Sequence, residues 1–205
     1  MRHVGVKPGD RVILYFACHG FLDQGEASLI PYDGLCPEEG KAVSREIDTW
    51  ISAYTFQRMF GPLSQNAHLL ALLNTCYAAK FIKESWQGHD PGEFSDRLER
   101  MGFYERQRLH PSNLVIAAAA MDEPILEGTN NDATQFTKRL GRALKGVADK
   151  HPQDGIVTAT EIFQYLVESA KGDIRDPKPH FGFLWSRQMS SDRASTQPFF
   201  IVKNQ

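Results

Sequence analysis

The sequence predicts an α/β protein, a three-layer α/β/α sandwich built on a mostly parallel sheet. Two observations predict this class: three short runs are apolar at both odd and even positions, and helical apolar stripes alternate with them. Strands that are apolar on both faces are typical of parallel sheets, because crossover helices cover both sides. The 205 residues, 41% of them hydrophobic, suffice for one core, and we expect a single domain over residues 1–205.

The three predicted core strands cover residues 11–18, 68–73 and 113–120. Each run is apolar at both odd and even positions, which indicates burial on both faces. The alanines of the third run also suit a helix, but Pro111-Ser112 before it and Asp122-Glu123-Pro124 after it favour a short strand. A further short strand is expected over residues 198–202.

Three apolar stripes at helical spacing separate or follow these runs. They consist of Ile47, Trp50, Ile51 and Tyr54; of Phe136, Leu140, Leu144 and Val147; and of Ile162, Phe163, Leu166, Val167 and Ala170. Thr158 and Glu161 form a capping-box pattern just ahead of the third stripe, which predicts where that helix begins.

The composition argues against several classes of protein. The net charge is −2 with no basic stripe, so we expect no nucleic-acid partner. No apolar run approaches the roughly 18 residues of a membrane span, and the first residues lack the apolar core of a signal peptide, so we expect a cytoplasmic protein without membrane contact. The three cysteines, Cys18, Cys36 and Cys76, are too few for a disulfide framework and form no CxxC pair for zinc.

Chemically capable residues follow the predicted strands at their carboxyl ends, where open α/β sheets bind ligands. His19 and Gly20 follow the first strand, and Asn74, Thr75 and Cys76 follow the second. A thiol needs a base or a cation to become a thiolate, and an imidazole can serve as that base. Taken singly, such a histidine is more often a surface residue and such a cysteine a small core residue. Their matching positions favour thiol catalysis.

Several motifs in a fixed order resemble the caspase and metacaspase clan of cysteine peptidases. Residues 9–20, GDRVILYFACHG, look like the strand that ends in the family's histidine, and residues 29–33, LIPYD, resemble the segment after it. Residues 72–78, LLNTCYA, resemble the nucleophile strand, with His19 57 residues before Cys76, near the caspase spacing of about 50. The similarity continues through residues 118–127, 134–137 and 155–166 to Phe199-Phe200.

The resemblance implies a caspase-like fold and a cysteine-type endopeptidase. His19 would be the general base, Cys76 the nucleophile, and backbone amides after Gly20 and at Cys76 would hold the oxyanion. Asn74, Asp122 and Glu123 would bind substrate, and the two carboxylates would favour cleavage after Arg or Lys. The alternative for both acids is that they are solvated loop residues. Hydrolysis through this dyad requires no cofactor and no metal.

The chain departs from the family pattern in two places. It begins almost at the histidine strand, without the usual strand-helix-strand, so we expect an N-terminally truncated fold whose open sheet edge is completed by a partner chain or an upstream segment. Tyr77-Ala78-Ala79 replaces the usual small residue and glycine after the cysteine. These departures keep two alternatives open: a non-catalytic caspase-like interaction module, and a thiol acyl transfer such as peptide ligation.

The other cysteines, and two further histidines, are expected to have structural rather than catalytic roles. Cys18 precedes the candidate base and is expected to point into the packing layers, whereas Cys36 lies in a predicted turn. His68 and His180 have no predicted strand-end position, so we expect surface or core roles for them.

Overall fold

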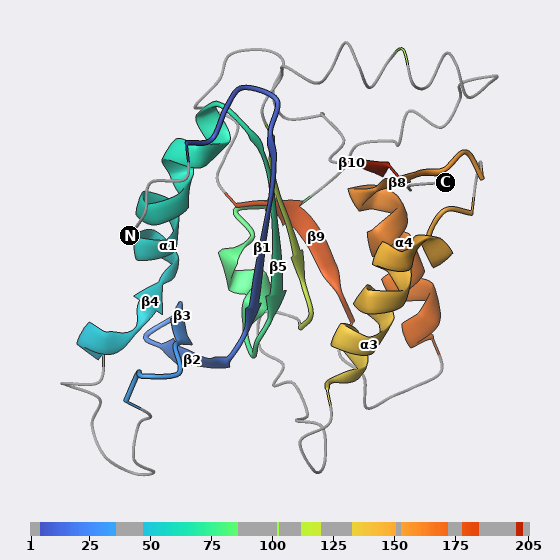
Figure 1. Ribbon diagram of the computed structural model, residues 1–205. Helices are drawn as coiled ribbons and strands as arrows, with labels where there is room; N and C mark the ends of the chain where they lie inside the picture. Colours follow the sequence, from blue (N-terminus) through green and yellow to red (C-terminus); the bar gives the residue numbers. More distant parts are fainter. Residues whose placement is uncertain are drawn as a thin grey trace.

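The computed structural model describes residues 5–35, 47–85, 102, 112–119, 133–150, 153–171, 178–184 and 200–202. Within them, a five-stranded, mostly parallel sheet lies between helices, as Figure 1 shows. The predicted mixed α/β class with a mostly parallel sheet is therefore confirmed.

The main sheet has the strand order β1-β5-β7-β9-β6. These strands span Arg11–Ala17 (β1), His68–Asn74 (β5), Ser112–Ala117 (β7), His180–Phe183 (β9) and Glu84–Ser85 (β6). β1, β5 and β7 are parallel neighbours, whereas β9 runs antiparallel to both β7 and β6. The three runs predicted as core strands are thus three adjacent parallel strands. β9 was not predicted, and His180 is its exposed first residue.

Helices cover the sheet on both sides (Figure 1). Helix α1, Ala53–Phe60, lies on one side, and α3, Gln135–Arg142, with α4, Ala159–Ala170, lies on the other. Side chains alternate along β5, so that Leu69 and Leu73 pack in the cluster with α1 while Leu70 and Leu72 pack in the cluster with α3 and α4. Each helical layer therefore has its own apolar core against the sheet.

Two small sheets and four helical turns complete the described elements. The small sheets are β2-β3-β4, spanning His19–Asp23, Glu26–Ile30 and Ile51–Ser52, and β8 with β10, spanning Ile156–Thr158 and Phe200–Val202. The turns are η1, Ile47–Thr49; η2, Gly61–Gln65; η3, Ala78–Phe81; and the π-helical η5, Ala143–Val147. The predicted last strand is present as β10.

The first predicted helix is wrong in its extent. Residues 47–49 form a 3₁₀ turn and Ile51 belongs to β4, so α1 begins only at Ala53, where the Ser52 hydroxyl accepts the Thr55 amide proton. Tyr54, expected on the buried stripe, is exposed, and Phe56 is the fully buried residue of this helix. Ile51 pairs with Leu29 in the β3–β4 sheet, so it does not join the helix that the spacing predicts.

The second predicted stripe ends early. Phe136 and Leu140 are buried, but Leu144 and Val147 are exposed. The reason is geometric: η5 is wound as a π-helix and Gly146 has a φ of 93°, so the side chains after Ala143 rotate out of the helical register. The third stripe behaves as expected, because Ile162 and Leu166 are buried and Thr158 and Glu161 form the predicted capping box.

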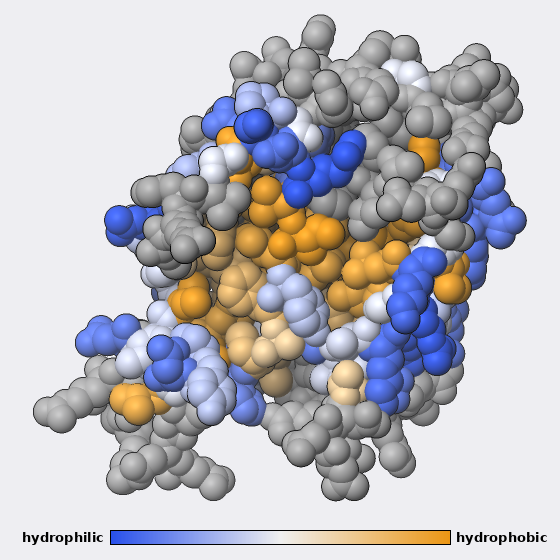
Figure 2. Space-filling model, viewed as in Figure 1, coloured by the Kyte–Doolittle hydropathy of each residue, from blue (hydrophilic) through white to orange (hydrophobic). Residues whose placement is uncertain are grey.

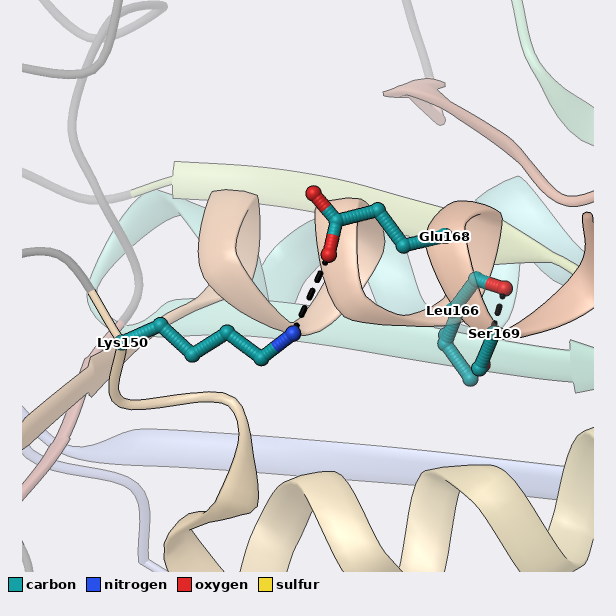
Figure 3. Close-up of polar contacts among 4 residues, drawn as sticks. All are labelled: Lys150, Leu166, Glu168 and Ser169. Carbon is teal, nitrogen blue, oxygen red and sulfur yellow. Dashed lines mark hydrogen bonds and ion pairs between the residues drawn. The ribbon is translucent and has the colours of Figure 1, made fainter.

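Figure 3 shows two further polar contacts of α4, beyond its capping box. Lys150 Nζ lies 3.1 Å from Glu168 Oε2, and Ser169 Oγ donates to the Leu166 carbonyl over 3.2 Å. Both partners of the ion pair are half exposed. Such a pair contributes on the order of 0–1 kcal/mol, so α4 is held mainly by its buried face.

Strand β1 forms one end of the main sheet. Its side chains alternate: Val12, Leu14 and Phe16 pack against the α1 cluster, whereas Ile13 and Tyr15 are 43% and 44% exposed. The expectation that this strand is covered on both faces is therefore wrong for the described residues. Figure 2 shows apolar side chains gathered on this face of the molecule, over the β1 edge.

Candidate active site

The ends of β1 and β5 place the two predicted catalytic residues at the same level of the sheet. Ala17 is the register partner of Asn74, so His19 and Cys76 each lie two residues beyond a matched pair. The carboxyl ends of adjacent parallel strands meet at one edge. The chain bends at Cys18, and His19 then begins β2, where it pairs with Ile30. The His19 residue is exposed to solvent.

Gly20 lies directly against the backbone of Cys76. A Cβ atom at Gly20 would overlap the Cys76 carbonyl oxygen and would lie 2.5 Å from Thr75 Oγ1 and 3.0 Å from the Cys76 carbonyl carbon. Only glycine therefore fits here without a shift of the backbone. This contact brings the chain immediately after His19 against the residue that carries the predicted nucleophile.

A tight turn follows Cys76. Tyr77 has φ 59° and ψ 18°, in the left-handed region that non-glycine residues adopt infrequently, and the 3₁₀ turn η3 begins at Ala78. Ala78, Ala79 and Phe81 are buried in the α1 cluster. The unusual Tyr77-Ala78-Ala79 sequence thus anchors the turn in the core. Cys76 itself is partly buried and takes part in no disulfide among the described residues.

Cys18 differs chemically from Cys76. It packs partly buried against the α1 cluster, as expected. Burial raises the pKa of the Cys18 thiol above its ordinary value of 9.0, and interactions with the Thr75 side chain and the Ile30 backbone offset only part of that rise. Thr75 Oγ1 is buried and makes no hydrogen bond of standard geometry within the described part of the chain. Cys18 is therefore a neutral thiol at physiological pH.

Asn74, predicted to bind substrate, is only 6% exposed and is held by threonines of α3. Its Nδ2 donates to Thr134 Oγ1 and to Thr137 Oγ1, each over 2.9 Å. Thr134 also caps α3 by accepting the Thr137 amide proton. Tyr15 Oη lies 2.7 Å from Thr137 Oγ1. Sequence reasoning missed Tyr15, whose only signal was a polar tip within an apolar strand.

The predicted acids of the substrate pocket, Asp122 and Glu123, lie outside the described residues, as does Cys36. The described part of this strand end is Ala118 and Ala119. Ala118 donates its amide proton to the Leu73 carbonyl over 2.8 Å, and the Ala119 carbonyl accepts from Ala79 over 3.2 Å. Backbone hydrogen bonds thus connect the residues after β7 to the end of β5 and to the turn that follows Cys76.

Among the described residues, no cluster of three or more His, Cys, Asp or Glu side chains could hold a metal ion. Within the same residues, no helix has the length and apolar character needed to cross a membrane.

A scan against protein-family models finds no match for this sequence. A search of curated proteins finds none with significant similarity.

Proposed function

We propose that this chain is a caspase-like cysteine endopeptidase of the cytoplasm, with His19 as general base and Cys76 as nucleophile. The observation that carries the proposal is the contact of Gly20 with the Cys76 backbone at the matched ends of β1 and β5. A base and a thiol on neighbouring strand ends are the minimum that thiol acyl transfer needs. The raised pKa of the Cys18 thiol supports Cys76 as the reactive one of these two cysteines.

The proposed reaction runs through a thioester. Cys76 Sγ forms a bond to the scissile carbonyl carbon while His19 takes the thiol proton. The C–N bond then breaks, and His19 returns the proton to the leaving amine. Water attacks the thioester with His19 again as base, which releases the carboxylic acid and restores the thiol. The backbone amides after Gly20 and at Cys76 would hold the oxyanion.

The proposed preference is for Arg or Lys at the residue before the scissile bond. Its support is the pair of acids, Asp122 and Glu123, that follow β7 in the sequence. Asn74 is neutral and favours neither sign of charge.

A panel of fluorogenic peptides that differ only at this position, with Arg, Lys, Asp, Asn or Ala, tests the activity and the preference together. We expect cleavage after Arg and Lys, loss of cleavage in Cys76→Ala and His19→Ala, and retained cleavage in Cys18→Ala. Cleavage after Asp would keep the peptidase and remove the acidic pocket. If an added amine becomes joined to the acyl part of the substrate by a new peptide bond, the activity is ligation instead.

The second candidate is a non-catalytic interaction module, and the place of β1 at the end of the main sheet among the described strands favours it. The exposed Ile13 and Tyr15 suit a partner chain or upstream segment that extends the sheet. Reaction with iodoacetamide separates the two candidates: a peptidase is modified at Cys76 far faster than at Cys36, whereas a binding module shows similar slow rates at both.

A further inference from the structure

Four side chains form a hydrogen-bonded cluster on the sheet face toward α3, next to the candidate dyad. They come from three elements: Tyr15 from β1, Asn74 from β5, and Thr134 with Thr137 from the start of α3. The Asn74 amide nitrogen lies 2.9 Å from each threonine oxygen, the two threonine oxygens are 3.1 Å apart, and Tyr15 Oη lies 2.7 Å from Thr137.

The acceptors in this cluster fix the direction of its protons. Thr134 Oγ1 accepts from Asn74 Nδ2 and from the Thr137 amide, so its own proton is directed to Thr137 Oγ1. Thr137 Oγ1 then accepts from both Asn74 and Thr134, and its proton is directed to Tyr15 Oη. A hydroxyl has one proton and two acceptor sites. Tyr15 therefore accepts within the cluster, and its own proton has no acceptor among the described residues.

Tyr15 is partly exposed, and its hydroxyl lies beside the end of β5. Its residue is 44% exposed, and its hydroxyl lies 3.5 Å from Asn74 Nδ2. Asn74 is the last residue of β5, and Cys76 follows two residues later, after the bend at Thr75. The Tyr15 ring lies on the opposite face of β1 from Leu14, Phe16 and Cys18, which pack in the α1 cluster. A hydroxyl donor thus lies close to the end of β5 that leads to the candidate nucleophile.

We propose that the Tyr15 hydroxyl binds substrate by donating a hydrogen bond to a carbonyl oxygen of the peptide lying across Cys76. The inference rests on the proposed function and adds a substrate-binding residue to it. The carbonyl could belong to the peptide backbone or to a side-chain amide. The cluster of Thr134, Thr137 and Asn74 acts by orienting the donor, because hydrogen bonds in such a chain polarise one another.

The test compares two reagents that alkylate the same sulfur. A peptidyl chloromethyl ketone must be bound as a peptide before it reacts, whereas iodoacetamide reacts without peptide recognition. In Tyr15→Phe we expect the second-order rate with the ketone at Cys76 to fall by about 2- to 10-fold, the effect of one neutral hydrogen bond. The iodoacetamide rate should stay unchanged. Tyr54→Phe, which removes the phenolic hydroxyl of exposed Tyr54 on α1, is the matched control and should alter neither rate.

Varying the ketone identifies the source of the carbonyl. An equal loss with Arg, Lys, Ala and Asn before the reactive group indicates a backbone carbonyl. A loss confined to Asn indicates a side-chain amide. Thr137→Val, which removes the hydroxyl that donates to Tyr15, should give a smaller loss, and the double variant should be no worse than Tyr15→Phe alone.

Two results would overturn the proposal, and they differ. If the ketones react faster than iodoacetamide but Tyr15→Phe reacts like wild type, Tyr15 does not bind substrate while the peptidase remains. If no peptidyl ketone reacts selectively at Cys76 in the wild type, the proposed function fails and the Tyr15 contact fails with it.

Discussion

At the scale of single residues, the candidate site depends on the close approach of Gly20 to Cys76. Gly20→Ala would force a methyl group into the Cys76 carbonyl and to within 2.5 Å of Thr75 Oγ1. We expect a loss of about 1–3 kcal/mol in the free energy of unfolding, as for other overpacked sites, and a marked loss of Cys76 reactivity. Chemical denaturation and iodoacetamide kinetics measure the two effects.

Gly141→Ala is the control for that substitution. Gly141 lies within α3 and has open space around its Cβ position, so alanine should stabilise the helix by about 0.5–1 kcal/mol. If Gly20→Ala and Gly141→Ala change the free energy of unfolding and the Cys76 reactivity equally, the site at Gly20 accepts a methyl group.

Cys18 gives the prediction that depends on pH. Because its pKa is raised in the folded state, the folded chain holds the thiol proton more tightly than the unfolded chain does. Its contribution to stability is therefore complete below the ordinary thiol pKa of 9.0 and decreases as the pH rises beyond it. The difference in melting temperature between wild type and Cys18→Ala should be constant from pH 6 to 8 and should shrink above pH 9. A difference that grows above pH 9 would contradict the assignment.

At the scale of elements, apolar runs were better predictors than helical stripes. The runs that became β5 and β7 are buried on both faces, and burial on both faces leaves little choice of structure. The stripe from Ile47 failed because the pairing of β4 with β3 takes Ile51, a contact between segments 22 residues apart that local spacing does not encode. Likewise the Tyr15 cluster joins residues more than 100 positions apart.

The capping box of α4 is the element that the sequence predicted in most detail. The Thr158 hydroxyl accepts from the Glu161 amide over 3.1 Å, and Glu161 Oε2 accepts from the Thr158 amide over 2.8 Å. Thr158→Ala should lower the free energy of unfolding by about 1 kcal/mol, whereas Thr158→Ser should retain most of it. Thermal denaturation followed by circular dichroism checks this order, and equal losses in both variants would assign the role of Thr158 to packing.

At the scale of the whole molecule, β1 is an edge strand of the main sheet, as far as the described residues show. Its neighbour β5 is buried along its entire length, while β1 is covered on one face only. An edge strand that is apolar on both faces is a template for another strand. We propose that a partner chain or upstream segment completes the sheet here, and that the chain alone associates through this edge.

Ile13→Lys tests that proposal, because a lysine on an edge strand opposes pairing with another chain. We expect the mass of the wild type, measured by light scattering, to rise with concentration, and the mass of Ile13→Lys to remain that of a monomer. Val147→Lys, at an exposed apolar residue of η5, adds the same charge away from β1 and should behave as the wild type. If it suppresses association equally, net charge rather than the edge is responsible. A wild type that stays monodisperse and monomeric at every concentration would show that β1 does not recruit a strand from another copy.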